Sequence, residues 1–204
     1  SLQKTVKYIR TKYPDIFTIA DAKRGDIANT SRMYARTFFN HLDFHAITLS
    51  PYMGQDTVEP FLTFDGKWVI LLALTSNNSF DDFQLIENSS TGKKLYEEVI
   101  SKSIHWGDEN NLMYVVGATR ANMLAEVRKI IPDHFLLVPG VGEQGGSVAE
   151  VAKFGMNKYC GLIVNSARAI LYSDHSMRFA GAARTKAMLL QKEMETALNE
   201  AGLI

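Results

Sequence analysis

The chain has 204 residues, with 22 lysines and arginines against 22 aspartates and glutamates, so its formal net charge is zero. A neutral balance argues against a nucleic-acid-binding protein, which normally carries a basic excess or a basic stripe. With 46% hydrophobic residues, the chain can bury a sizeable core as a single domain over residues 1–204, and no apolar run is long enough to span a membrane. The single cysteine, Cys160, excludes an internal disulfide framework and is typical of a cytoplasmic protein.

Short apolar runs alternate with amphipathic segments along the chain. The runs predict six strands, at residues 17–23, 46–50, 68–74, 113–117, 135–138 and 162–165. Helices are expected over 2–13, after Thr119, after the capping-box pair Ser147 and Glu150, and over 186–201. Strand–helix alternation of this kind predicts a parallel sheet with helices on its outer side.

Two α/β architectures fit six strand–helix units. One is an open, doubly wound sheet. The other is a (β/α)8 barrel of the TIM type, which needs eight units and about 250 residues. The barrel fits if its first two βα units are missing from this chain, so that residues 1–204 form an N-terminally truncated barrel domain. The motifs at the strand ends favour the barrel.

The first predicted strand ends in charged residues, Asp21 and Lys23, and Asp26 follows three residues later. Because side chains alternate along a strand, Phe17 and Ile19 share a face with Asp21 and Lys23. In a barrel this face would place two apolar layers below a charged pair at the C-terminal mouth, where the active sites of barrels lie. Buried charges are unfavourable unless paired or used, so we interpret the pair as part of a site.

A glycine-rich loop, 139–146, follows the second-last strand, and Arg168 follows the last one. The loop contains G-x-G-x-x-G, but the acidic residue that a dinucleotide-binding fold places about 20 residues later is replaced by the region of Asn165. Barrels often bind phosphate with the loops after strands seven and eight. Gln144, the backbone of Gly145 and the guanidinium of Arg168 would suit a phosphate group.

These motifs, in this order, resemble one family. The pattern Asp21-x-Lys23-x-x-Asp26 is similar to the catalytic signature of the orotidine 5′-phosphate decarboxylases, and Arg168 lies where their phosphate-binding arginine belongs. Further similar segments are 26–30, 50–54, 75–77, 116–119 and 139–146. The set covers nearly the whole chain and resembles the longer bacterial subgroup of the family.

The resemblance implies decarboxylation of orotidine 5′-phosphate to UMP without a cofactor or metal. Lys23 would protonate the C6 carbanion, and Asp21 would lie beside the departing carboxylate. The family uses a Lys–Asp–Lys–Asp tetrad, whose first lysine lies on the second barrel strand, and a ribose-binding aspartate on the first. Neither strand is found in this sequence. We therefore expect this chain to be inactive or impaired alone, and the intact protein to carry roughly 60 more N-terminal residues.

The resemblance also implies a set of binding residues. Asp26 and Thr30 would complete the site of the partner subunit in a homodimer, and Ser76 would contact the pyrimidine. Gln144, Gly145 and Arg168 would hold the 5′-phosphate. No nucleic-acid or membrane partner is implied.

Three other functions remain open on the sequence. A magnesium-dependent sugar-phosphate aldolase or decarboxylase on the same barrel shares D-x-K-x-x-D but uses an additional acidic ligand, and the loop 26–30 favours the orotidine enzyme over it. A non-catalytic barrel that binds a phosphate ligand and a dinucleotide oxidoreductase are the others. The five histidines show no metal-ligand spacing, and Cys160 has no partnering motif, so we interpret them as structural.

Overall fold

The computed structural model describes residues 1–118, 121–141 and 146–204. Its six strands pair in parallel, in the order of the sequence. They are β1 (Ile19–Arg24), β2 (Ala46–Leu49), β3 (Trp68–Leu74), β4 (Leu112–Val116), β5 (Leu136–Pro139) and β6 (Leu162–Asn165). A doubly wound sheet reverses its strand order at a switch point, whereas a barrel does not. The sheet is therefore a parallel half-barrel with β1 and β6 at its edges.

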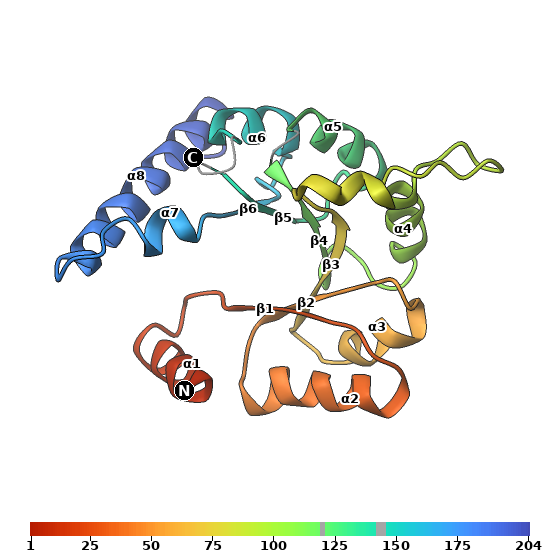
Figure 1. The fold of residues 1–204 in the computed structure, drawn as a ribbon, viewed down its shortest axis with the longest axis horizontal. Helices are drawn as coiled ribbons and strands as arrows, with labels where there is room; N and C mark the ends of the chain where they lie inside the picture. Colours follow the sequence, from red (N-terminus) through yellow and green to blue (C-terminus); the bar gives the residue numbers. More distant parts are fainter. Residues whose placement is uncertain (119–120, 142–145) are drawn as a thin grey trace.

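Helices cover the outer side of this curved sheet (Figure 1). They are α1 (Leu2–Lys12), α2 (Ala28–Arg36), α3 (Gln55–Leu62), α4 (Leu95–Ser103), α5 (Ala121–Ile130), α6 (Val148–Gly155), α7 (Arg168–Leu171) and α8 (Phe179–Glu200), with a π-helical turn η1 (Thr37–His41) and a 3-10 helix η2 (Asn78–Asp82). The predicted alternation of parallel strands and outer helices is confirmed. Within the described ranges, no helix has the length and apolar character to cross a membrane.

Strand alternation divides the apolar side chains between two clusters. On β3, Val69 and Leu71 pack into the large core between the sheet and the helices. Ile70 and Leu72 belong to a smaller cluster on the inner side, together with residues of the other strands. Because both faces of the sheet are covered with apolar side chains near its middle, the strands read as nearly continuous hydrophobic runs.

The prediction that Phe17 forms an inner apolar layer is wrong. Phe17 lies outside β1, is 42% exposed and stacks on His45, with ring centroids 5.2 Å apart, so it adds no layer to the inner cluster. Met188 is 46% exposed, although Met194 of the same helix does pack against the core. Helix α8 contacts α6 and α7 along one narrow stripe, which leaves the rest of its surface to solvent.

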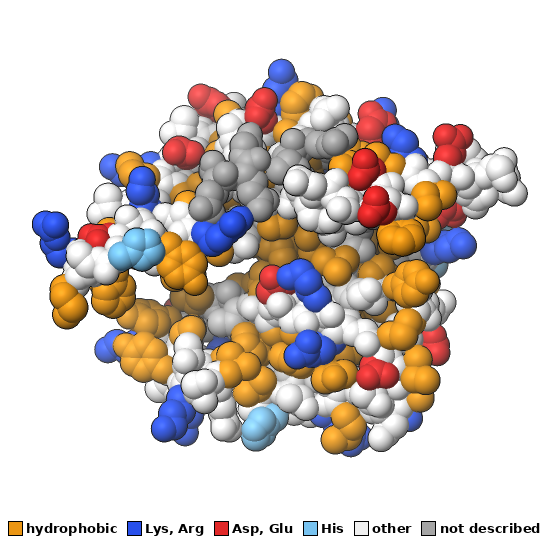
Figure 2. All heavy atoms as spheres, in the orientation of Figure 1, with side chains coloured by type: hydrophobic (Ala, Val, Ile, Leu, Met, Phe, Trp, Pro, Cys, Tyr) orange, Lys and Arg blue, Asp and Glu red, His pale blue; other side chains and the backbone are white. Residues whose placement is uncertain are grey.

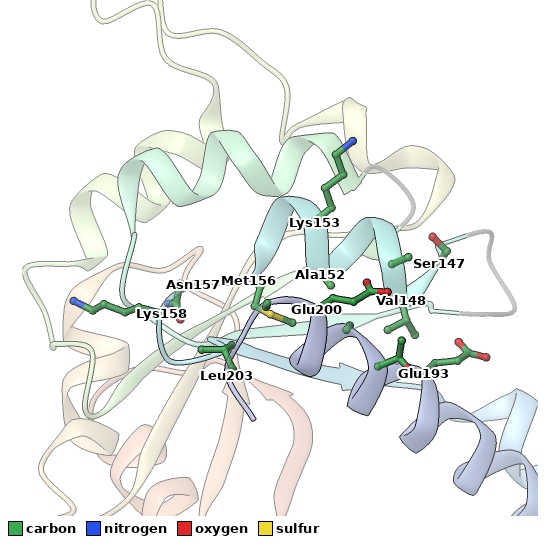
Figure 3. Close-up of a pocket in the computed structure, with 14 residues that line it drawn as sticks. Ser147, Val148, Ala152, Lys153, Met156, Asn157, Lys158, Glu193, Glu200 and Leu203 are labelled. Atoms are coloured by element: carbon green, nitrogen blue, oxygen red, sulfur yellow. The ribbon is translucent and has the colours of Figure 1, made fainter.

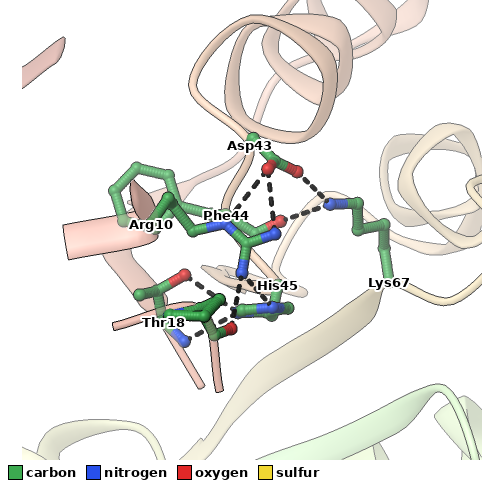
Figure 4. Close-up of polar contacts among 7 residues, drawn as sticks. Arg10, Thr18, Asp43, Phe44, His45 and Lys67 are labelled. Atoms are coloured by element: carbon green, nitrogen blue, oxygen red, sulfur yellow. Dashed lines mark hydrogen bonds and ion pairs between the residues drawn. The ribbon is translucent and has the colours of Figure 1, made fainter. Parts of the chain in front are cut away.

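A polar cluster at the N-terminal ends of β1 to β3, here called the basal cluster, contains Arg10, Thr18, Asp43, His45 and Lys67 (Figure 4). Asp43 accepts hydrogen bonds from Arg10 Nε at 3.0 Å and from Lys67 Nζ at 2.9 Å. The backbone N–H of Thr18 donates to His45 Nδ1 at 2.9 Å. The bond from Lys67 lowers the pKa of Asp43, whereas burial, followed by the charge of Arg10, lowers the pKa of His45. The cluster ties α1 to the starts of three strands.

Candidate functional site

A pocket of about 930 Å³ lies at the C-terminal ends of the strands, where the active sites of barrels are found. Figure 2 shows this face hollowed near its centre, with hydrophobic side chains on the floor and charged side chains beside it. Four predicted site residues line this pocket: Asp21, Lys23, Ser76 and Arg168. The structure thus brings together residues that lie as far apart in the sequence as β1 and the start of α7.

A second pocket, of about 750 Å³, lies between α6 and α8 on the outer, helical side of the sheet (Figure 3). Its walls carry Lys153, Lys158, Glu193 and Glu200. None of the predicted site residues that the structure describes lines it. We therefore assign the candidate site to the pocket at the strand ends.

Asp21 and Lys23 form a joined ion pair in the pocket. Lys23 Nζ lies 2.6 Å from Asp21 Oδ1 and 2.7 Å from Oδ2, so one ammonium bridges both carboxylate oxygens. The side chains of Lys23 and Asp21 are 51% and 57% exposed. The pair lies at the mouth of the strands and is half-exposed there, because β1 is an edge strand of the described sheet.

Thr48 on β2 positions both charged residues, a role that was not predicted from the sequence. Its hydroxyl donates to Asp21 Oδ1 at 2.9 Å and accepts the backbone N–H of Lys23, also at 2.9 Å. Thr48 is fully buried. The available signal was a lone hydroxyl in the otherwise apolar run 46–49, because a buried polar group needs hydrogen-bond partners.

The backbone at Lys23 departs from regular strand geometry. Its φ is +47°, in the left-handed region, and the register between β1 and β2 shifts between Ala20 and Arg24. A residue with a Cβ atom adopts this region at a cost of roughly 1–2 kcal/mol. Bulges of this kind re-aim side chains beside active sites, and strained residues cluster there. The irregularity leaves Asp21 and Lys23 on the same side of the sheet.

Ser76 reaches the pocket from the loop after β3, against the end of β4. A Cβ atom at Gly117 would lie 2.7 Å from Ser76 Cβ and 2.8 Å from its backbone nitrogen, so a larger residue there would push the serine away. The same loop is held from outside by Gln84, whose side chain bonds the backbone and hydroxyl of Thr75. Ser76 is therefore positioned by close packing on one side and hydrogen bonds on the other.

Arg168 begins α7 and lines the pocket beside Gly140 and Val141 of the loop after β5. Gly140 has φ +92°, a conformation that favours glycine. The other two predicted phosphate ligands, Gln144 and Gly145, lie outside the described residues. An arginine at this position can bind an anion through two parallel hydrogen bonds.

Asp26 and Thr30 do not line the pocket. Asp26 Oδ1 accepts the backbone N–H of Ile27 at 2.8 Å, and Thr30 is exposed near the start of α2. Their predicted role in a partner's site stays a prediction.

Metal ligands and the lone thiol add no further group to the site. Among the residues described, no cluster of three or more His, Cys, Asp or Glu side chains is arranged to hold a metal ion. Cys160 lies at the N-terminal end of β6, where its Sγ is 3.8 Å from the carbonyl oxygen of Leu162 and its side chain packs against the core. Among the described residues, the charged groups that line the pocket are thus an ammonium, a carboxylate and a guanidinium.

Comparison with known proteins agrees with this geometry. Residues 2–181 match the sequence model of the orotidine 5′-phosphate decarboxylase / HUMPS family. The chain is similar to an orotidine 5′-phosphate decarboxylase of Phocaeicola vulgatus, with 58% identity over 96% of this chain and 71% of the relative. The relative of the same name from Parabacteroides distasonis is 56% identical over 100% of this chain and 72% of its own length.

A solved structure gives the same result. The chain resembles the OMP decarboxylase of Leishmania donovani with a TM-score of 0.79 and 33% identity, over 95% of this chain and 73% of that one. The length of the matches, the sequence identity and the shared fold all point to the same family. The chain belongs to the orotidine 5′-phosphate decarboxylase / HUMPS family.

Proposed function

We propose that the chain belongs to a cytoplasmic enzyme that removes CO2 from orotidine 5′-phosphate to give UMP, the last step of de novo pyrimidine biosynthesis. The observation that carries this proposal is the joined pair of Asp21 and Lys23 in the same pocket as Arg168. A volume of about 930 Å³ suits a ligand of nucleotide size. The relatives at 55–58% identity carry the name of this enzyme.

Lys23 is the proposed acid. The bond between C6 and the carboxylate breaks, CO2 leaves, and the electron pair stays on C6. The ammonium of Lys23 stabilises this developing carbanion and then transfers a proton to C6, after which it regains a proton from water. Asp21 holds Lys23 Nζ at 2.6 and 2.7 Å and lies beside the departing carboxylate. No cofactor takes part in this scheme.

Arg168 is the proposed phosphate ligand, together with Gln144 and Gly145. Its place on the far side of the pocket from β1 would hold the 5′-phosphate while the ring lies at Lys23. Binding energy at a remote phosphate can then organise the closed site around the reacting ring. Ser76, on the loop between these two ends of the pocket, would contact the pyrimidine.

We also propose a homodimer in which Asp26 and Thr30 complete the partner's pocket. Ile27 and Met33, which flank Thr30 in sequence, are 58% and 50% exposed. Exposed apolar side chains around a polar residue are typical of a protein interface. These exposed apolar side chains are better explained by contact with a second protein chain than by exposure to solvent.

The finer fold proposal is an eight-stranded barrel. The curated relatives are longer, since the chain matches 71% and 72% of their lengths, and in the described part the sheet is open at β1 and β6. Two further βα units would close it and supply the second tetrad lysine and the ribose-binding aspartate that the family resemblance implies. We expect a chain without these units to be inactive or severely impaired.

The test is turnover of orotidine 5′-phosphate by the intact protein. We expect UMP and CO2 in equal amounts, with the same rate in the presence of EDTA. Loss of activity in EDTA would favour the magnesium-dependent sugar-phosphate enzyme, which the joint family description keeps as a second candidate. Binding of UMP without turnover would favour a non-catalytic phosphate-ligand barrel.

A further inference from the structure

Three side chains beside the pocket form a hydrogen-bond relay whose direction is fixed by a backbone group. The N–H of Thr75 can only donate, and it donates to Gln84 Oε1 at 2.8 Å. Gln84 must therefore turn its amide nitrogen to the other contact, where Nε2 donates to Thr75 Oγ1 at 2.7 Å. Because the hydroxyl of Thr75 accepts there, its own proton is free to donate to Asn77 Oδ1 at 2.6 Å.

In the structure the hydroxyl of Thr75 donates to Asn77, and this contact sets which end of the Asn77 amide the pocket meets. The carbonyl oxygen of Asn77 is engaged by Thr75, so the remaining polar group of the side chain is the amide nitrogen with its two N–H donors. Asn77 lines the pocket next to Thr75 and Ser76. A ligand in the pocket therefore meets a hydrogen-bond donor at Asn77.

Gln84, the outer residue of the relay, is held in place by its own backbone hydrogen bonds. The backbone N–H of Gln84 donates to the carbonyl oxygen of Phe80 at 3.0 Å, and its own carbonyl oxygen accepts the N–H of Tyr96 at 3.2 Å. On the pocket side, the backbone of Gly117 packs closely against Ser76, the residue before Asn77. The segment that carries Asn77 is thus held from both sides.

We propose that Asn77 donates a hydrogen bond to a carbonyl oxygen of the substrate's pyrimidine ring and selects a uracil-type ring over a cytosine-type ring. This inference rests on the proposed function, which places the reacting edge of the ring at Lys23. The loop after β3 lies between Lys23 and Arg168 in strand order, and Asn77 on this loop lines the same pocket as both residues. A cytosine ring carries an amino donor where uracil has a carbonyl, and two donors cannot bond.

The same relay assigns positioning roles to Gln84 and Thr75. In Gln84→Glu the introduced carboxylate has no donor, so the hydroxyl of Thr75 would donate to it and accept from Asn77 Nδ2. The amide of Asn77 would then turn its oxygen to the pocket. A substitution outside the pocket is thus expected to change the group that Asn77 presents to the pocket from a hydrogen-bond donor to an acceptor.

The test is the ratio of UMP to CMP affinity, measured by calorimetric titration of the intact protein. Asn77→Asp removes the donor, and we expect UMP binding about tenfold weaker, with a clearly smaller UMP-to-CMP ratio. The added charge repels the phosphate of both nucleotides equally and cancels in the ratio. The control Asn78→Asp makes the same change at the next residue, which does not line the pocket, and should leave the ratio unchanged.

Gln84→Glu tests the relay itself and should lower the ratio in the same direction, whereas Gln191→Glu, on the exposed surface of α8, should not. An unchanged ratio in Asn77→Asp would overturn the assignment of Asn77, and an unchanged ratio in Gln84→Glu alone would overturn the relay. Failure of the unmodified protein to bind UMP would count against the proposed function itself, a result distinct from either of these.

Discussion

The chain places an acid–base cluster at each end of its strands, and the two differ in how their polar groups are used. In the basal cluster, Asp43 is shared by Arg10 and Lys67, whose side chains are only 26% and 18% exposed. At the mouth, Asp21 pairs with one cation, Lys23, and this lysine is 51% exposed. The carboxylates are similarly exposed, at 52% and 57%, so the cations make the difference.

The comparison separates stability from reactivity. Lys67 donates to Asp43 and to the carbonyl oxygen of Phe44, and its stem is half-buried, so its contacts lie within the protein. Lys23 is oriented by one carboxylate but faces a pocket. Lys67, enclosed among protein acceptors, stabilises the starts of the strands. Lys23 has one carboxylate partner in an open pocket, so its ammonium can also contact a ligand.

The largest expected effect is at Lys23. In the intact protein, Lys23→Ala should lower turnover of orotidine 5′-phosphate by about a thousandfold or more, because the proton donor and the charge beside C6 are both lost. In the 204-residue chain, the free energy of unfolding should change by less than about 0.5 kcal/mol, since an exposed ion pair contributes little. Steady-state kinetics and urea denaturation measure the two quantities.

The matched change at the other end is Lys67→Ala. It should lower the free energy of unfolding by about 1–2 kcal/mol, because the half-buried hydrogen bonds to Asp43 and Phe44 are lost. The turnover of the folded fraction should stay unchanged. Equal effects of the two substitutions on turnover would remove the distinction between the clusters.

A smaller effect is expected from removing a single hydroxyl at each end. Thr48→Val keeps the side-chain shape but removes two hydrogen bonds, one to the backbone N–H of Lys23 and one to the carboxylate of Asp21. Turnover should therefore fall roughly tenfold. Thr18→Val removes a hydroxyl within 3.0 Å of His45 Nδ1 and should affect only stability. If Thr48→Val leaves kcat unaltered, Thr48 has no role in positioning the pair.

The smallest effect is a pH dependence of stability from the basal cluster. The folded pKa of His45 lies below its unfolded value near 6.5, chiefly through burial. Above that pH both states are neutral and stability is full; as the pH falls below about 6.5, the unfolded chain takes up a proton first and stability declines. His134, whose pKa burial also lowers, adds in the same direction.

His45→Gln should therefore flatten, but not abolish, the fall of the urea midpoint between pH 7.5 and pH 5. The slope is bounded by one proton for each histidine. A steeper decline in the variant than in the unmodified protein would show that His45 is not the neutral group described here.

Much of the candidate site could be predicted from the sequence. Asp21, Lys23, Ser76 and Arg168 each follow or end an apolar run, and parallel strands bring their C-terminal ends to one edge. Thr48 and Gln84 could not be assigned roles in this way. Thr48 bonds Asp21 across 27 positions of sequence, and the partners of Gln84 depend on how the loop after β3 folds back.

The sequence by itself determined the alternation of six strands with outer helices and the residue types at the strand ends, because periodicity and turn residues are local properties. Only the tertiary structure decided how exposed Phe17, Met188 and the Asp21–Lys23 pair are. It also decided the orientation of the Asn77 side-chain amide. These depend on which surfaces a neighbouring element covers and on where a distant donor points. Packing sets both after the local elements have formed.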